Sequence, residues 1–194
     1  MKTRDVTTSG SNSRSTKILY VTGRGGSLDK GLAVYLASIA NEFEGVAVDV
    51  PFLRQAPMDQ VTAIQQKLMA DPARIVIANS YGAYLTLQAL VDLDNPPQQM
   101  LLLAPVLGMV SAKDRMYISR PPFTKRLRSA FDENRVARPS SILIVVGDQD
   151  PLFNHDQFDE INAYFGGRAL SVFPGEGHSL SRDIIRTLVS SLTQ

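Results

Sequence analysis

Short apolar runs alternate with segments of helical period along most of the chain, and this alternation limits the fold more than any other feature. These runs are continuous rather than apolar at every second position, which is typical of strands covered on both faces. The clearest example is Ile142 to Val146. Between the runs, apolar residues recur three and four positions apart, as in the stripe of Ile184, Leu188 and Leu192. We predict strands at residues 17–22, 46–50, 74–79, 100–104, 141–146 and 169–173, and helices at residues 29–41, 58–70, 81–93, 153–165 and 180–192.

Strands that alternate with helices through short connections indicate right-handed crossovers and a doubly wound α/β fold. We predict a six-stranded, mostly parallel sheet in the order 2-1-3-4-5-6 with helices on both faces, and Asp29 as the N-cap of the first helix. In such sheets, ligands bind outside the carboxyl ends of the strands, at the point where the strand order reverses. The residues that follow each strand are therefore the candidates for function.

The length of 194 residues suits one domain with a single substantial core. Residues 1–16 are rich in Ser, Thr and Asn, so we predict a flexible tail there and a single domain over residues 17–194. Residues 105–138, called the basic segment below, interrupt the alternation and contain the helix-breaking pair Pro121-Pro122.

Composition excludes several classes of protein. The chain has no cysteine, which removes disulfides, thiolate catalysis and Cys-ligated zinc. Its two histidines have no close acidic partner in a metal-binding pattern, so no metal and no cofactor are expected. A net charge of +1 argues against a nucleic-acid partner.

The N-terminus lacks the apolar region of a signal peptide, and the most apolar stretch, residues 100–110, is too short to span a membrane, so we expect a cytoplasmic protein. The sequence does not indicate an oligomeric state.

A serine follows the third predicted strand, in the sequence Ala78-Asn79-Ser80-Tyr81-Gly82. This pattern is typical of a nucleophile elbow, a strained turn whose small neighbours let the strand and the next helix approach closely. Ala78 stands where the first glycine is usual. In the alternative interpretation, Ser80 simply caps the helix, because serine is a favoured N-cap residue.

Carboxylates and an imidazole follow the fifth and sixth predicted strands. Asp148 and Asp150 lie in the loop after the fifth strand, and His178 lies in a glycine-flanked loop after the sixth. A carboxylate can orient an imidazole, which in turn can activate a serine hydroxyl. We choose Asp150 because it begins the loop to the next helix, while Asp148 stays a competitor; both residue types also occur in ordinary turns. The other histidine, His155, lies at the start of a helix, where a surface role suits it.

Ser80, Asp150 and His178 thus follow three strands whose carboxyl ends share one edge of the predicted sheet. Their order along the chain is that of the α/β-hydrolases and differs from the order in chymotrypsin and subtilisin. We predict that they form a catalytic triad.

A triad of this kind also needs two backbone N–H donors that stabilise an oxyanion. One should come from Tyr81, the residue after the nucleophile. The other should come from the loop at residues 22–27, which faces Ser80 across the point where the strand order reverses. Arg24 is our prediction for this second donor, with Gly25 as the alternative.

From about Lys17 to its C-terminus the chain resembles the small single-domain members of the α/β-hydrolase superfamily. The resemblance rests on Gly23-Arg24-Gly25-Gly26, Ala78-Asn79-Ser80-Tyr81-Gly82, Gly147-Asp148-Gln149-Asp150 and Gly177-His178. It implies a serine hydrolase that cleaves an ester, thioester or amide of a small-molecule acyl substrate through an acyl-serine intermediate. The chain departs from the superfamily in two ways: Thr22-Gly23 stands where many members have His-Gly, and the early antiparallel hairpin has no counterpart.

The cap that larger members of this superfamily insert corresponds here, at most, to the basic segment. This segment contains eight basic and three acidic residues. As a short cap it would bias the pocket toward anionic acyl substrates or a thioester of coenzyme A. The plainer interpretation is an amphipathic helix whose charges face water.

Two other functions compete with hydrolysis. Gly23 and Gly25 after the first strand, with Asp49 at the end of the second, partly match a dinucleotide-binding pattern, but Leu28 stands where that pattern requires glycine or alanine. The second alternative is a binding protein that keeps the hydrolase fold without turnover, because a fold does not guarantee a chemistry.

Overall fold

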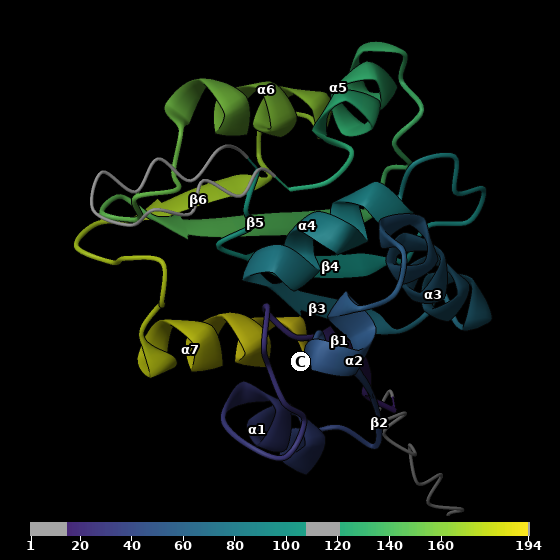
Figure 1. The fold of residues 1–194 in the computed structure, drawn as a ribbon. Helices are drawn as coiled ribbons and strands as arrows, with labels where there is room; N and C mark the ends of the chain where they lie inside the picture. The colour runs from purple at the N-terminus through teal and green to yellow at the C-terminus, as the bar shows by residue number, and fades with distance from the viewer. Residues whose placement is uncertain (1–14, 108–120, 194) are drawn as a thin grey trace, which may run out of the picture.

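The computed structural model describes residues 15–107 and 121–193, and in these ranges six strands form one parallel sheet (Figure 1). The strands are β1 (Lys17–Val21), β2 (Glu42–Val46), β3 (Ile75–Asn79), β4 (Gln99–Leu103), β5 (Ser141–Gly147) and β6 (Leu170–Phe173). Their order across the sheet is β2-β1-β3-β4-β5-β6, and every neighbouring pair is parallel. The predicted doubly wound sheet and its strand order are confirmed.

Helices cover both faces of this sheet (Figure 1). They are α1 (Leu32–Ile39), α2 (Val50–Leu53), α3 (Pro57–Ala70), α4 (Ser80–Ala89), α5 (Thr124–Asp132), α6 (His155–Tyr164) and α7 (Arg182–Leu192). Helices α1 and α7 pack on one face, and α3, α4, α5 and α6 pack on the other. Successive strand residues alternate between the two layers: Met100 and Leu102 pack toward α4, whereas Leu101 and Leu103 pack toward α1 and α7. Burial on both faces accounts for the continuous apolar runs.

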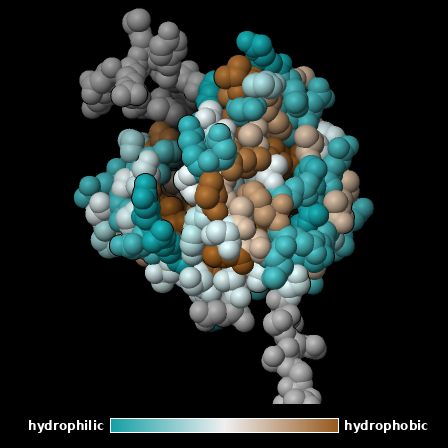
Figure 2. Space-filling model, turned by 90° about the horizontal axis from the view of Figure 1, so that it is seen from below, coloured by the Kyte–Doolittle hydropathy of each residue, from teal (hydrophilic) through white to brown (hydrophobic). Residues whose placement is uncertain are grey.

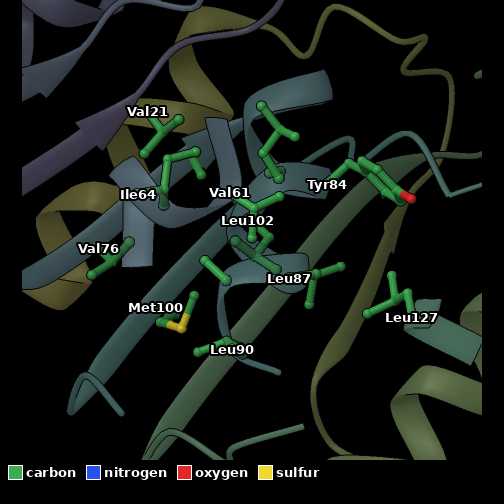
Figure 3. Close-up of a cluster of buried hydrophobic side chains, with 14 of the residues drawn as sticks. Val21, Val61, Ile64, Val76, Tyr84, Leu87, Leu90, Met100, Leu102 and Leu127 are labelled. Atoms are coloured by element: carbon green, nitrogen blue, oxygen red, sulfur yellow. The ribbon is translucent and has the colours of Figure 1, made fainter. Parts of the chain in front are cut away.

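Helix α4 lies at the centre of the larger core layer (Figure 3). Every residue from Gly82 to Ala89 is buried, against side chains such as Ile64 of α3 and Met100 of β4. Ser80 is the first residue of this helix. The candidate nucleophile is therefore attached to one of the most firmly packed elements of the described structure.

The prediction for the second strand was wrong by four residues. β2 is Glu42–Val46 instead of residues 46–50. It is an edge strand that pairs only with β1, and its side chains alternate: Phe43 packs into the core, while the Glu44 carboxylate accepts hydrogen bonds from two basic side chains. An edge strand need not be apolar on both faces. The criterion of a continuous apolar run therefore identified the apolar loop around the buried Val48 instead of β2.

The prediction of Asp29 as the cap of the first helix was also wrong. Helix α1 begins at Leu32, and Gly31 occupies the N-cap position with a φ of 61°. This left-handed conformation is accessible to glycine at little cost. The Asp29 carboxylate instead accepts a hydrogen bond from the hydroxyl of Ser27.

The domain boundaries stay predictions. The predicted tail lies outside the described residues except for Ser15 and Thr16, and residues 108–120 of the basic segment lie outside them as well. Because all the strands above belong to one sheet, we propose a single domain from residue 17 onward. Across the ranges that the structure describes, none of the helices combines the length and the apolar character needed to cross a membrane.

Candidate active site

Ser80 stands at the sharp turn between β3 and α4. Its φ of 52° lies in the left-handed region, which costs a non-glycine residue about 1–3 kcal/mol, and such strained residues cluster at functional sites. Asn79 occupies the N-cap position, and Ser80 Oγ lies 2.8 Å from Nε2 of His178. The hydroxyl therefore faces an imidazole rather than the first turn of its own helix, so the capping interpretation does not describe this structure.

Asp150 continues the chain of hydrogen bonds on the other side of His178. Its Oδ2 lies 2.8 Å from Nδ1 of His178, and its Oδ1 accepts a hydrogen bond of 2.8 Å from the N–H of Leu152. The residue is only 6% exposed. An ionised carboxylate can only accept hydrogen bonds, so Nδ1 carries the proton and Nε2 is left to accept the hydroxyl proton of Ser80. The structure thus brings the three predicted residues together, from the ends of β3, β5 and β6.

Asp148, the competing carboxylate, does not contact the imidazole. Its Oδ1 accepts a hydrogen bond of 2.8 Å from the N–H of Gly175, and its own N–H donates to the carbonyl of Phe173 at 3.1 Å. Asp148 therefore holds the start of the loop that carries His178, whereas Asp150 lies beside the ring.

Two glycines allow the loops of the site to approach one another. A Cβ on Gly82 would lie 2.1 Å from the carbonyl oxygen of Thr22, and a Cβ on Gly147 would lie 2.0 Å from that of Glu176. The first close approach brings the loop after β1 to the head of α4. The second brings the loop with the imidazole to the end of β5, and hence to Asp150.

The backbone N–H groups near Ser80 differ in whether they already have a partner. The N–H of Gly25 donates to the carbonyl of Val48 at 2.8 Å, which removes this residue as an oxyanion donor. Arg24 lies outside the regular helices and strands, and its N–H donates to no backbone carbonyl of the described residues. The N–H of Tyr81 lies in the first turn of α4, where a helix offers it no carbonyl four residues earlier. Arg24 and Tyr81, the two predicted donors, thus have N–H groups available for a ligand.

A cavity of about 300 Å³ opens beside Ser80 and His178. Its apolar wall consists of Leu32, Leu103, Leu180 and Ile185. Figure 2 shows the face of the molecule covered by α1 and α7, where apolar side chains lie among hydrophilic ones. The sequence offered no signal for these four wall residues, because they follow the same periodicity as the core.

A larger cavity, of about 490 Å³, lies between α4, α5 and α6 and is lined by neither Ser80 nor His178. Its wall includes Tyr84, Leu127 and Tyr164. Because no nucleophile with an activating base lines it, we assign the candidate chemistry to the smaller cavity.

None of the described cations of the basic segment lines the Ser80 cavity, and the arginines among them contact other residues. The Arg126 guanidinium donates to the side-chain oxygen of Gln88 on α4 at 2.7 Å, and Arg128 pairs with Glu160 of α6 at 3.7 Å. Arg135 forms ion pairs with two acidic residues outside the cavity. In its described part, the segment therefore forms an amphipathic helix against the flank of α4, and none of its cations lines the cavity.

The residues that a dinucleotide-binding or metal-binding function would use have structural roles or lie outside the Ser80 cavity. Asp49, the acid of the dinucleotide-binding alternative, caps α2 by accepting a hydrogen bond of 3.0 Å from the N–H of Phe52. His155 is exposed and lies against the ring of Phe153. In residues 15–107 and 121–193, no three His, Asp or Glu side chains are grouped closely enough to hold a metal ion.

Comparison with known proteins finds similarity at the level of structure. No family model and no curated protein sequence matches this chain. Among solved structures, a monoacylglycerol lipase from Paleococcus ferrophilus superimposes with a TM-score of 0.65 at 13% identity, over 92% of this chain and 96% of that one. Esterase PE8 does so with a TM-score of 0.62 at 14% identity, over 92% and 91% of the two chains. A predicted hydrolase from Thermoplasma acidophilum gives a TM-score of 0.60 at 15% identity, over 94% and 88%. At these identities the similarity concerns the fold and not the activity. The chain has the α/β-hydrolase fold.

Proposed function

We propose that this protein hydrolyses carboxylic esters or thioesters of small-molecule acyl substrates through an acyl-serine intermediate on Ser80. The observation that carries the proposal is the pair of 2.8 Å contacts that join Ser80 Oγ to Nε2 of His178, and Nδ1 of His178 to Asp150. A serine hydroxyl is a weak nucleophile near neutral pH and needs a base within this distance.

In the first half of the reaction, Ser80 Oγ attacks the carbonyl carbon while Nε2 of His178 takes the hydroxyl proton. The negative charge that develops on the carbonyl oxygen is stabilised by the N–H groups of Arg24 and Tyr81. When the tetrahedral intermediate collapses, the leaving alcohol or thiol takes the proton from His178 and the acyl group stays on Ser80. Asp150 keeps the imidazole in the required tautomer and stabilises its charged form.

In the second half, a water molecule attacks the acyl-serine. His178 takes a proton from the water and then returns it to Ser80 Oγ, which releases the carboxylic acid and restores the site. The names of the similar solved structures, an esterase and a lipase among them, are in line with this class of reaction.

Labelling with a fluorophosphonate probe tests the proposal, because such a probe reacts with an activated serine. We expect the wild-type protein to be labelled and Ser80→Ala and His178→Ala to lose both labelling and p-nitrophenyl ester hydrolysis by several orders of magnitude. Ser190→Ala, on the exposed side of α7, is the matched control and should behave as the wild type does. A wild-type protein that is neither labelled nor active on esters would contradict the proposal and favour a binding protein without turnover.

A screen over p-nitrophenyl esters, acyl-coenzyme A thioesters and lipid esters then separates the substrate classes. The cavity volume of about 300 Å³ lies at the lower end of the range of small-molecule sites, so we expect short acyl groups to give the highest kcat/KM.

A further inference from the structure

Arg24 is the one charged residue, apart from the candidate triad, among the described residues that line the Ser80 cavity. No Asp or Glu of the described residues lines it, and the uncharged part of the wall is shared between aliphatic residues and small polar ones. Arg24 is exposed, and no carboxylate in the described ranges forms an ion pair with it. By contrast, Arg74, Arg128 and Arg135 each pair with an acidic side chain. The site therefore presents one cation that the described protein does not neutralise.

In the chain, the residue that carries this cation lies next to a close neighbour of Ser80. Arg24 follows Gly23, on which a Cβ would lie 3.3 Å from the Cβ of Ser80. Burial raises the pKa of the Tyr81 hydroxyl, and the positive charge of Arg24 opposes that rise, so the guanidinium acts on this hydroxyl as well as lining the cavity. A substrate carbonyl held by the N–H of Arg24 would have the guanidinium within one side-chain length.

The two sides of the carbonyl group face different parts of the cavity. His178 hands its proton to the leaving group, so the leaving group must face the imidazole. The acyl group then extends away from the imidazole, and Arg24 is the charged residue of the described lining that remains for it. A negative charge on the acyl group is the one that this cation can reach.

We propose that the Arg24 guanidinium is a specificity-determining group that binds a carboxylate on the acyl part of the substrate. This inference rests on the proposed function of Ser80. Arginine binds a carboxylate through two parallel N–H···O hydrogen bonds, which supply orientation as well as attraction. The Arg24 guanidinium and the small cavity together define the substrate class as half-esters or half-thioesters of short dicarboxylic acids. Water is the co-reactant, and the products are a dicarboxylate, an alcohol or thiol, and a proton.

Two esters of matched size and leaving group test this inference: the p-nitrophenyl half-ester of adipic acid, which is an anion, and p-nitrophenyl heptanoate, which is neutral. We expect the wild type to prefer the anionic ester in kcat/KM. Arg24→Gln should lower kcat/KM for the anionic ester about tenfold more than for the neutral ester, so that the preference for the anion is lost. Arg24→Lys, which keeps the charge without the planar fork, should lie between them. All these variants retain the backbone N–H at position 24, so its role toward the oxyanion is not altered.

Lys30→Gln is the matched control, because Lys30 is an exposed cation of the same loop that does not line the cavity. It should leave the preference for the anionic ester unchanged. The wild-type preference should also decrease as salt is added, since an exposed ion pair is screened.

A second measurement needs no turnover. Adipate should slow the labelling of Ser80 by a fluorophosphonate in the wild type, and should not slow it in Arg24→Gln. The inference is overturned if the wild type shows no preference for the anionic ester, if Arg24→Gln lowers kcat/KM for both esters equally, or if adipate affects both proteins alike. Each of these outcomes leaves the proposed function intact. Absence of both ester turnover and labelling in the wild type removes the proposed function and this inference with it.

Discussion

Replacing Gly147 with alanine should displace the loop that carries His178 without changing any residue of the proposed triad. Gly147 ends β5, and a Cβ there would lie 2.0 Å from the carbonyl oxygen of Glu176 and 2.3 Å from its carbonyl carbon. Both are backbone atoms, so no side-chain rotation relieves the overlap. Ordinary contact begins at 3.4 Å, so the loop must retreat by roughly 1.4 Å, the difference between 3.4 and 2.0 Å. The φ of Gly147 is not positive, so alanine itself is not strained there.

A retreat of this size is large compared with the tolerance of the hydrogen bonds in the site. The imidazole follows the loop, and the contacts to Ser80 and Asp150, each 2.8 Å, cannot both survive. Misplacement of a reacting group by about 1 Å can lower a rate about 100-fold. Overpacking of this kind also costs about 1–3 kcal/mol of stability. We expect Gly147→Ala to lower kcat about 100-fold or more and the free energy of unfolding by about 1–3 kcal/mol.

The assay combines kcat on a p-nitrophenyl ester with unfolding in urea. Gly177→Ala is the control, because Gly177 precedes His178 in the same loop and a Cβ there would meet nothing within 4 Å. It should keep kcat within about threefold and stability within about 0.5 kcal/mol of the wild type. The reasoning is refuted if Gly147→Ala keeps most of its activity, or if the control loses as much.

Three further contacts predict measurable effects. Asp150→Asn should lower kcat by about 10,000-fold because an amide does not hold the imidazole in the required tautomer, whereas Asp148→Asn should lose less than about tenfold; steady-state kinetics compare the two. Arg126→Ala leaves a buried amide oxygen on α4 without its donor and should destabilise the protein by about 1–3 kcal/mol, while the exposed Lys125→Ala should change stability by less than about 0.5 kcal/mol in urea unfolding. A hydrogen bond from a lysine of α3 lowers the pKa of Glu44, so its stabilising effect is present above the unfolded pKa of about 4.5 and is lost as pH falls through the lower folded value. Glu44→Gln should therefore be less stable than the wild type at pH 7 by at most about 1 kcal/mol, and the difference should shrink in urea titrations as the pH falls below about 4.5.

For each of these contacts, one experimental result would contradict the role that we assign to it. A larger loss in Asp148→Asn than in Asp150→Asn would reverse their roles. An Arg126→Ala protein as stable as the wild type would mean that water replaces the guanidinium. A stability difference for Glu44→Gln that persists unchanged in acid would show that the carboxylate acts through packing rather than charge.

Parallel strands buried on both faces leave a strong local signal, so the sheet could be predicted from the sequence. Continuous apolar runs such as Ile142 to Val146 identify central strands, and right-handed crossovers leave few strand orders to choose from. Because the carboxyl ends of parallel strands share one edge, the same reasoning predicted that Ser80, Asp150 and His178 lie near one another. The edge strand β2 could not be predicted in this way because one of its faces carries Glu44, which pairs with basic side chains instead of packing among apolar ones.

Choices between neighbouring residues in one loop could not be made from the sequence. Asp148 and Asp150 are two residues apart, and only the path of the loop after β6 decides which carboxylate meets the imidazole. In the same way, Gly25 is excluded as an oxyanion donor by a hydrogen bond to Val48, which belongs to a segment far along the chain. Such contacts depend on shifts of about one ångström, to which residue type and periodicity are insensitive.

The sequence by itself therefore determined the layered architecture and the loops that converge, because those follow from local periodicity and from the geometry of parallel strands. Tertiary structure alone decided which groups in those loops touch and which apolar residues face a cavity instead of the core. Leu32, Leu103 and Ile185 have the same pattern as buried neighbours, and only the packing of α1 and α7 around the end of β4 leaves a space beside them. In the same way, the tertiary structure alone places Arg24 on the lining of this cavity.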